Sequence, residues 1–98
     1  MRESRTRKGV LLTQICGQYL LVADRNARKI CPYVRHVNET GALIWKMLES
    51  GAEDEAIIIS LKESYDLPEE EAASAVGFFL EQLTSSGYLK TEDNHEEK

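Results

Sequence analysis

The chain has 98 residues, of which 42% are hydrophobic and 30% charged, with a formal net charge of −5. This length allows one domain with a small core and leaves little chain for an elaborate catalytic pocket. Its longest apolar run is far shorter than the roughly 20 residues of a membrane-spanning helix, and no secretory signal follows its basic start. We therefore expect a soluble, cytoplasmic protein.

The charge divides the sequence into two unlike halves. Residues 1–37 carry 8 Lys and Arg against 2 Asp and Glu, a net of +6, whereas residues 38–98 carry 4 against 15, a net of −11. An acidic ligand would be attracted to the first half and repelled by the second.

The first third of the chain predicts three short strands. Residues 1–8 are basic and polar, and we expect them to be flexible. Residues 10–15 and 19–23 are apolar and β-prone, residues 24–28 favour a turn, and residues 29–37 form a third extended segment. Pro32 in the third segment has no N–H to donate, which suits an edge strand and leaves open a bulge or an early strand end there.

Three helices are predicted next. Asn38 suits the N-cap of the first helix, which Gly51 ends. The second helix covers residues 54–65, and the third runs from Pro68 to about Ser86, with Pro68 at its first position. The expected buried stripe of the second helix is Ile57, Ile58, Leu61 and Tyr65.

This element order predicts an α+β fold that is winged-helix-like, with a three-stranded antiparallel sheet followed by three helices. We expect one domain over residues 9–90. The acidic residues 91–98 are expected to be a disordered tail.

The sequence offers no arrangement typical of a catalytic or metal site. Cys16 and Cys31 lack metal-binding spacing, and we expect two reduced, partly buried thiols on strands, with a disulfide between them left open. His36 and His95 have no further ligands at a suitable spacing. We therefore expect no cofactor, no metal and no enzyme activity.

A winged-helix order raises DNA binding as the main alternative. The predicted third helix contains four Glu and no Lys or Arg, although each phosphate contact needs a cation. That composition disfavours a DNA-binding regulator. The edges of the sheet are the better candidates, because an extended peptide, or a second copy in a homodimer, can add there as a further strand.

The segment from Val37 to Trp45, with the sequence VNETGALIW, begins a pattern that resembles the PqqD-like family. The pattern continues through Leu48, Ile58, Leu61, Tyr65-Asp66, Val76, Phe79, Leu80, Leu83 and Gly87-Tyr88-Leu89. Members of that family are recognition elements for ribosomally made, modified peptides. The resemblance implies a non-catalytic peptide chaperone that binds the leader of a precursor peptide and presents it to a radical S-adenosylmethionine maturase or a lasso-type leader protease.

In the family, the leader adds antiparallel to the third strand and lies in a groove beside the third helix. Carried over by position, the candidate contacts are Lys29, Ile30, Cys31, Tyr33, Val34, Arg35, Ala75, Phe78, Phe79 and Gln82. Phe79 falls on an apolar position of the family and is expected to pack as well. Phe78 lies about 100° further around the helix, either as an exposed anchor or packed against another helix.

Two residues depart from the family pattern. Pro32 removes one main-chain donor from the third strand, and Arg35 stands where many relatives carry an apolar or aromatic residue. The charges of Arg28, Lys29 and Arg35 would suit acidic residues in a leader. The segment from Val37 to Trp45 is expected to fix the strand end and not to bind the ligand.

Overall fold

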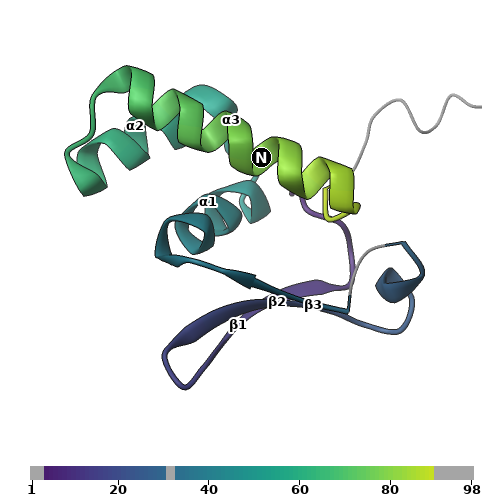
Figure 1. The fold of residues 1–98 in the computed structure, drawn as a ribbon. Coiled ribbons are helices and arrows are strands. Elements are labelled where there is room, and N and C mark those ends of the chain that lie inside the picture. The colour runs from purple at the N-terminus through teal and green to yellow at the C-terminus, as the bar shows by residue number, and fades with distance from the viewer. Residues whose placement is uncertain (1–3, 31–32, 90–98) are drawn as a thin grey trace, which may run out of the picture.

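The computed structural model describes residues 4–30 and 33–89. The chain forms β1 (Val10–Ile15), β2 (Gln18–Ala23), the 3₁₀ helix η1 (Ala27–Lys29), β3 (Val34–Val37), α1 (Glu39–Glu49), α2 (Asp54–Tyr65) and α3 (Glu69–Ser86) (Figure 1). The predicted order of three strands and then three helices is confirmed. Cys31, Pro32 and the acidic tail lie outside the described residues.

The sheet is an antiparallel meander in the order β1-β2-β3. Ile15 pairs with Gln18, so the β1–β2 hairpin turns on Cys16 and Gly17, whose φ angles are 52° and 79°. Positive φ at both central positions is typical of a type I′ turn, whose twist matches that of the two strands. Cys16 is therefore an exposed free thiol in the turn, and its predicted partly buried place on a strand is wrong.

The third strand is shorter than predicted, because the chain coils after β2. The Ala27 N–H donates to Asp24 Oδ1 at 2.8 Å, and Ala27 is 3% exposed, so burial and this side-chain hydrogen bond favour η1 over an extended chain. Lys29 ends η1, and Ile30 is its C-cap with helical backbone angles. Their predicted place on the third strand is wrong, and β3 begins at Val34.

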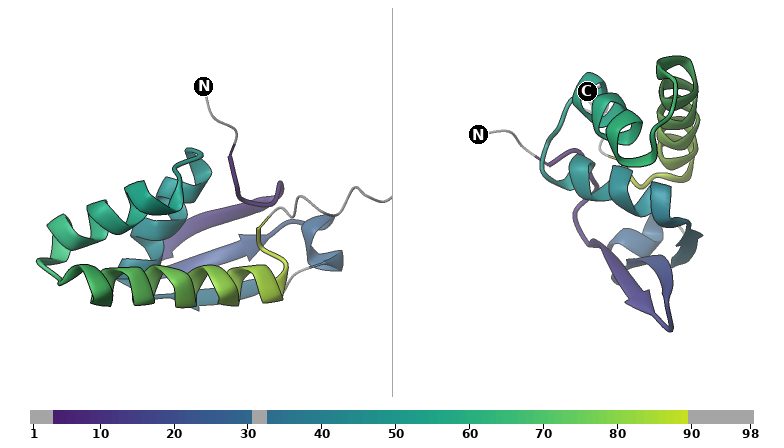
Figure 2. Two further views of the ribbon diagram at one scale, coloured as in Figure 1. Left: turned by 90° about the horizontal axis from the view of Figure 1, so that it is seen from above. Right: turned by 90° about the vertical axis from the view of Figure 1, so that its left-hand side faces the viewer.

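The helices form two layers over one face of the sheet. In Figures 1 and 2, α1 lies next to the sheet, while α2 and α3 pack together beyond it. Trp45 on α1 is completely buried and meets Tyr88 edge to face, with ring centroids 6.4 Å apart. The core around them consists of further fully buried side chains, with Ile44 and Leu48 on α1 itself and Leu21, Ile57, Leu61, Val76 and Leu83 on the elements that pack around it.

The helix ends follow the sequence signals with two differences. The predicted Asn38 cap is confirmed, because Asn38 Oδ1 accepts from the Gly41 N–H at 2.7 Å. Pro68 is the extended N-cap residue of α3 and not its first helical residue. Tyr65, predicted to be buried on α2, is 36% exposed, because it lies in the last turn and the core ends at Leu61.

Residues 4–7 are bonded into the domain, where the sequence predicts a flexible segment over residues 1–8. The Arg5 N–H donates to Leu48 O at 2.9 Å, the Arg7 N–H donates to Tyr88 O at 2.8 Å, and Thr6 bridges to Leu89. The segment thus joins the end of α1 to the chain after α3. The last carbonyls of a helix lack partners within the helix, so they can accept hydrogen bonds from the N–H groups of residues 4–7.

The Arg5 side chain adds to this link, since its Nη1 donates to Ala52 O at 2.9 Å and to Asp54 Oδ1 at 2.8 Å.

In the part of the chain that the structure describes, no helix combines the length and apolar character that crossing a bilayer requires.

We expect Arg5→Ala to lower the free energy of unfolding by about 1–2 kcal/mol, because it removes a part-buried hydrogen bond and an ion pair. Asp54→Asn should cost less than half of this, since solvent screens the exposed pair. Urea unfolding followed by the fluorescence of Trp45, the single tryptophan, measures both. Arg25→Ala, an exposed arginine in the turn after β2, is the control. Equal free energies of unfolding for the Arg5 and Arg25 variants would contradict a stabilising role for the Arg5 bonds.

Candidate functional site

The outer edge of β3 carries free main-chain groups. The Ala23 N–H donates to Tyr33 O at 2.8 Å, and the same register places Leu21 opposite Arg35. In an antiparallel ladder the bonded pairs alternate, so Tyr33, Arg35 and Val37 direct their main-chain groups toward β2.

The residues between them direct theirs away from the sheet. The N–H and C=O groups of Val34 and His36 point to the open side of β3, and no strand of the described residues pairs with that side. This edge can therefore accept a further strand.

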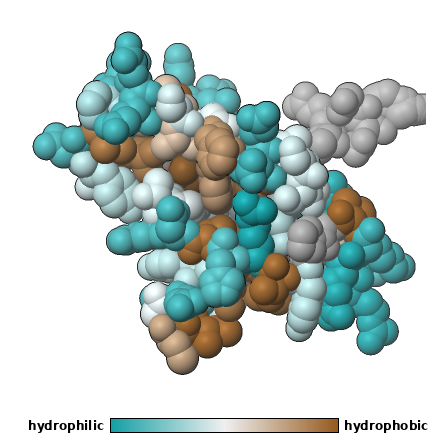
Figure 3. All heavy atoms as spheres, viewed as in Figure 1, coloured by the Kyte–Doolittle hydropathy of each residue, from teal (hydrophilic) through white to brown (hydrophobic). Residues whose placement is uncertain are grey.

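The side chains of β3 alternate between the two faces of the sheet. Arg35 lies opposite the buried Leu21 and faces the helices, whereas Val34 is 45% exposed on the outer face. Figure 3 shows apolar side chains exposed over the sheet as well as over the helices on this side of the molecule.

A pocket of about 290 Å³ lies between β3, the start of α1 and α3. The view from above in Figure 2 shows α3 running along the β3 side of the sheet. The pocket is lined by Arg35, His36, Val37, Asn38, Thr40, Gly41, Ile44, Ala75, Phe78 and Phe79. It adjoins the free edge of β3, and we call the edge and the pocket together the β3–α3 groove.

Two neighbouring phenylalanines of α3 have different roles in this groove. Phe79 is partly buried and packs on the first turn of α1, where a Cβ at Gly41 would lie only 2.9 Å from its ring. Phe78 is 65% exposed and lines the same pocket. Of the two placements open for Phe78, the structure has the exposed one.

Arg35 lies where the groove meets the end of α3. Its Nη1 donates to Ser86 Oγ at 3.3 Å, whereas its buried Nε has no hydrogen-bond partner. The side chain is half-buried and contributes the positive charge of the groove lining.

The structure thus brings four predicted site residues into one pocket: Arg35, Ala75, Phe78 and Phe79. Gln82 is half-buried on α3 outside this lining, and Cys31 lies outside the described residues. Tyr33 is 55% exposed, with the Arg28 guanidinium 4.2 Å from its ring centroid. Lys29 and Ile30 are exposed at η1, before the strand begins.

Sequence reasoning missed the wall that the end of β3 and the first half of α1 form. The residues from Val37 to Trp45, which run from the end of β3 into α1 and were expected only to fix the strand end, supply Val37, Asn38, Thr40, Gly41 and Ile44 to the pocket. The one available signal was Gly41, because an internal helical Gly costs about 1 kcal/mol relative to Ala and often marks close packing.

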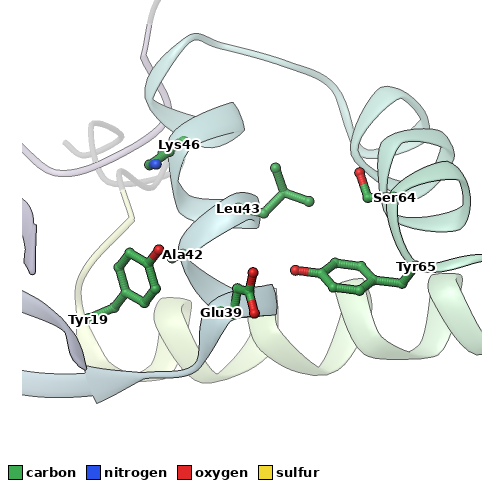
Figure 4. Close-up of a pocket in the computed structure, with 7 residues that line it drawn as sticks. All are labelled: Tyr19, Glu39, Ala42, Leu43, Lys46, Ser64 and Tyr65. Atoms are coloured by element: carbon green, nitrogen blue, oxygen red, sulfur yellow. The ribbon is translucent and has the colours of Figure 1, made fainter. Parts of the chain in front are cut away.

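A second pocket of about 330 Å³ opens between β2, α1 and α2 and is lined largely by polar side chains (Figure 4). Figure 4 shows the Tyr65 hydroxyl directed toward the Glu39 carboxylate. A hollow of about 390 Å³ at the sheet end shares Tyr19 and Glu39 with this pocket, and His36, Val37 and Asn38 with the β3–α3 groove. Concave surface therefore continues from the groove around the start of α1.

Metal-ligating side chains do not gather in the described ranges, where no three of the His, Cys, Asp and Glu residues lie close enough to hold an ion. The groove lining combines apolar, amide and hydroxyl groups with Arg35 and His36. This composition suits binding of an extended peptide.

We expect Phe78→Ala to change the free energy of unfolding by less than about 0.5 kcal/mol, since its ring is already exposed. Phe79→Ala should lower it by about 2 kcal/mol, because it removes the packing on Gly41. Urea unfolding of the two variants makes the comparison. Equal losses would mean that Phe78 belongs to the core and not to the groove.

The fold is shared with two solved structures. One is described as "TbiB1 in Complex with the TbiA(beta) Leader Peptide", with 18% identity, 90% of this chain and 96% of that chain covered, and a TM-score of 0.74. The other is "Lasso peptide synthetase B1 complexed with the leader peptide", with 20% identity, 89% and 96% covered, and a TM-score of 0.73. At these identities the likeness establishes the fold.

No curated protein matches this sequence. The family model of coenzyme PQQ synthesis protein D (PqqD) matches residues 33–89, which include β3, all three helices and the residues of the pocket. Since that match spans more than half of the chain, this protein belongs to the PqqD family.

Proposed function

We propose that this protein is a non-catalytic recognition domain that binds the leader segment of a ribosomally made precursor peptide. The observation that carries the proposal is the free edge of β3 beside an apolar pocket under α3. Membership of the PqqD family supports it, as do the two similar structures, which are described as complexes with leader peptides.

In this proposal the leader adds to β3 as a fourth, antiparallel strand. Its main chain bonds to the outward groups of Val34 and His36, which gives affinity that depends little on the peptide sequence. Every second side chain of the leader then faces α3, and one apolar side chain enters the pocket beside Phe78. The pocket supplies the selectivity that the main-chain bonds lack.

The chemistry on the precursor belongs, in this proposal, to a separate enzyme. That enzyme is a radical S-adenosylmethionine maturase or a lasso-type leader protease. The fold shared with lasso peptide synthetase B1 supports the second.

DNA binding, the alternative raised by the winged-helix order, gains no support. A DNA-recognition helix needs cationic side chains to contact phosphates and hydrogen-bonding side chains to contact base edges. Helix α3 carries Glu69, Glu70 and Glu71 in its first turn and has no Lys or Arg between Glu69 and Ser86.

The direct test is titration of a fluorescently labelled leader peptide from a precursor encoded beside this protein's gene. We expect saturable binding at least about tenfold tighter than that of a scrambled peptide, a difference of about 1.4 kcal/mol. Fluorescence anisotropy measures both. Equal affinity for the leader and its scrambled version would contradict the proposal.

A proline at the β3 edge tests strand addition separately. His36→Pro removes an N–H that points away from β2, so the sheet should persist while leader affinity falls about tenfold or more. His36→Ala, which keeps the main-chain donor, should bind nearly as tightly as the wild type. Isothermal titration gives the affinities, and circular dichroism checks the fold.

Gln14→Pro is the matched control, placed on the opposite edge of the sheet. Ile15 and Gln18 flank the two-residue turn as a bonded pair, so the Gln14 N–H points away from β2 on the β1 side. This variant should keep the wild-type affinity. A loss of affinity equal to that of His36→Pro would place the peptide elsewhere.

A further inference from the structure

Arg35 is a charged side chain whose hydrogen-bonding capacity is largely unused. A guanidinium has five N–H donors and requires acceptors for them when it leaves water. One donor reaches Ser86 Oγ at 3.3 Å, at the long end of hydrogen-bond distances. Nε is buried and has no partner.

No carboxylate of the described residues neutralises this charge. Arg5 pairs with Asp54 and Lys62 with Glu69, and none of these four residues lines the pocket. A half-buried guanidinium without a counter-charge costs free energy in the unliganded protein. A carboxylate arriving with the peptide would recover that cost and could bond to two of the nitrogens at once.

The place of Arg35 defines which peptide side chain it can meet. Arg35 and Val37 lie two residues apart on the helix-facing side of β3, and both line the pocket that contains Phe78. A strand added beside β3 presents its own side chains to the same side at every second position. The peptide residue beside Val37 therefore enters the apolar part of the pocket, and the residue two positions away faces Arg35.

We infer that the β3–α3 groove selects peptides with an Asp or Glu two positions from an apolar residue, and that Arg35 is the residue that determines this specificity. The inference rests on the proposed function, since it assumes strand addition at β3. It assigns one acidic position within the bound segment, which is a narrower statement than attraction between the basic half of the chain and an acidic ligand.

The test is selection of random peptides from a displayed library on the wild-type protein and on Arg35→Glu. Wild-type selections should share Asp or Glu two positions from an apolar residue, whereas Arg35→Glu should select Lys or Arg there. For one enriched peptide, replacing the acidic residue with its amide should weaken binding to the wild type by about 10- to 100-fold. On Arg35→Gln the same replacement should change affinity by less than about threefold.

Arg25→Glu is the matched control, because it makes the same charge change at an exposed turn outside the groove lining. Peptides selected on Arg25→Glu should still carry the acidic residue. If they do not, the preference depends on the overall charge of the protein and not on Arg35 specifically. Where Arg35→Glu does not fold by circular dichroism, Arg35→Gln replaces it in the selection and should lose the acidic preference.

The outcomes separate the two proposals. In one outcome, peptides selected on the wild-type protein bind it, bind His36→Pro more weakly, and share no acidic position. This outcome would overturn the inference about Arg35 and leave the leader-binding proposal intact. A library with no binders, or with binders unaffected by His36→Pro, would contradict strand addition at β3 and this inference together.

Discussion

The contact between the Phe79 ring and Gly41 sets how closely α3 approaches α1, and the shape of the groove depends on it. A Cβ at position 41 would lie 2.9 Å from the ring, so only glycine lets Phe79 sit on the first turn of α1. With α1 held between the sheet and α3, α3 lies over β3 without occupying its edge. The pocket is the space that this arrangement leaves between the three elements.

The local features of the fold were predictable from the sequence, and the long-range ones were not. The Asn38 cap and the helix-ending glycines act through neighbouring main-chain groups, so their residue types alone indicate helix boundaries. The coil of η1 depends on burial of Ala27, and the bonds of Arg5 join residues far apart in sequence. Neither leaves a periodic pattern that a sequence window can detect.

The residues of the candidate site also separate into those that local sequence could predict and those that it could not. Phe78 was predictable as a residue beside the buried stripe of α3, because helical geometry places it on the neighbouring face. The lining by Thr40 and Ile44 was not predictable, since their part in the pocket depends on the angle at which α3 crosses α1. Lys29 and Ile30 were placed by assuming that the third strand begins at Lys29 and continues through Pro32. In the structure Lys29 ends η1 and Ile30 has helical backbone angles, so the strand does not include them.

Arg35 bears on a problem that every free strand edge has, which is pairing with a second copy of the same protein. A homodimer formed edge to edge through β3 would be isologous, so it would bring Arg35 of one copy toward Arg35 of the other on the same face of the joined sheet. Like charges at close range, partly shielded from water under α3, disfavour that pairing. An acidic peptide added at the same edge brings a negative charge toward Arg35, so that pairing is attractive. One residue can thus weaken self-association and favour the ligand, while the main-chain groups of Val34 and His36 serve either partner equally.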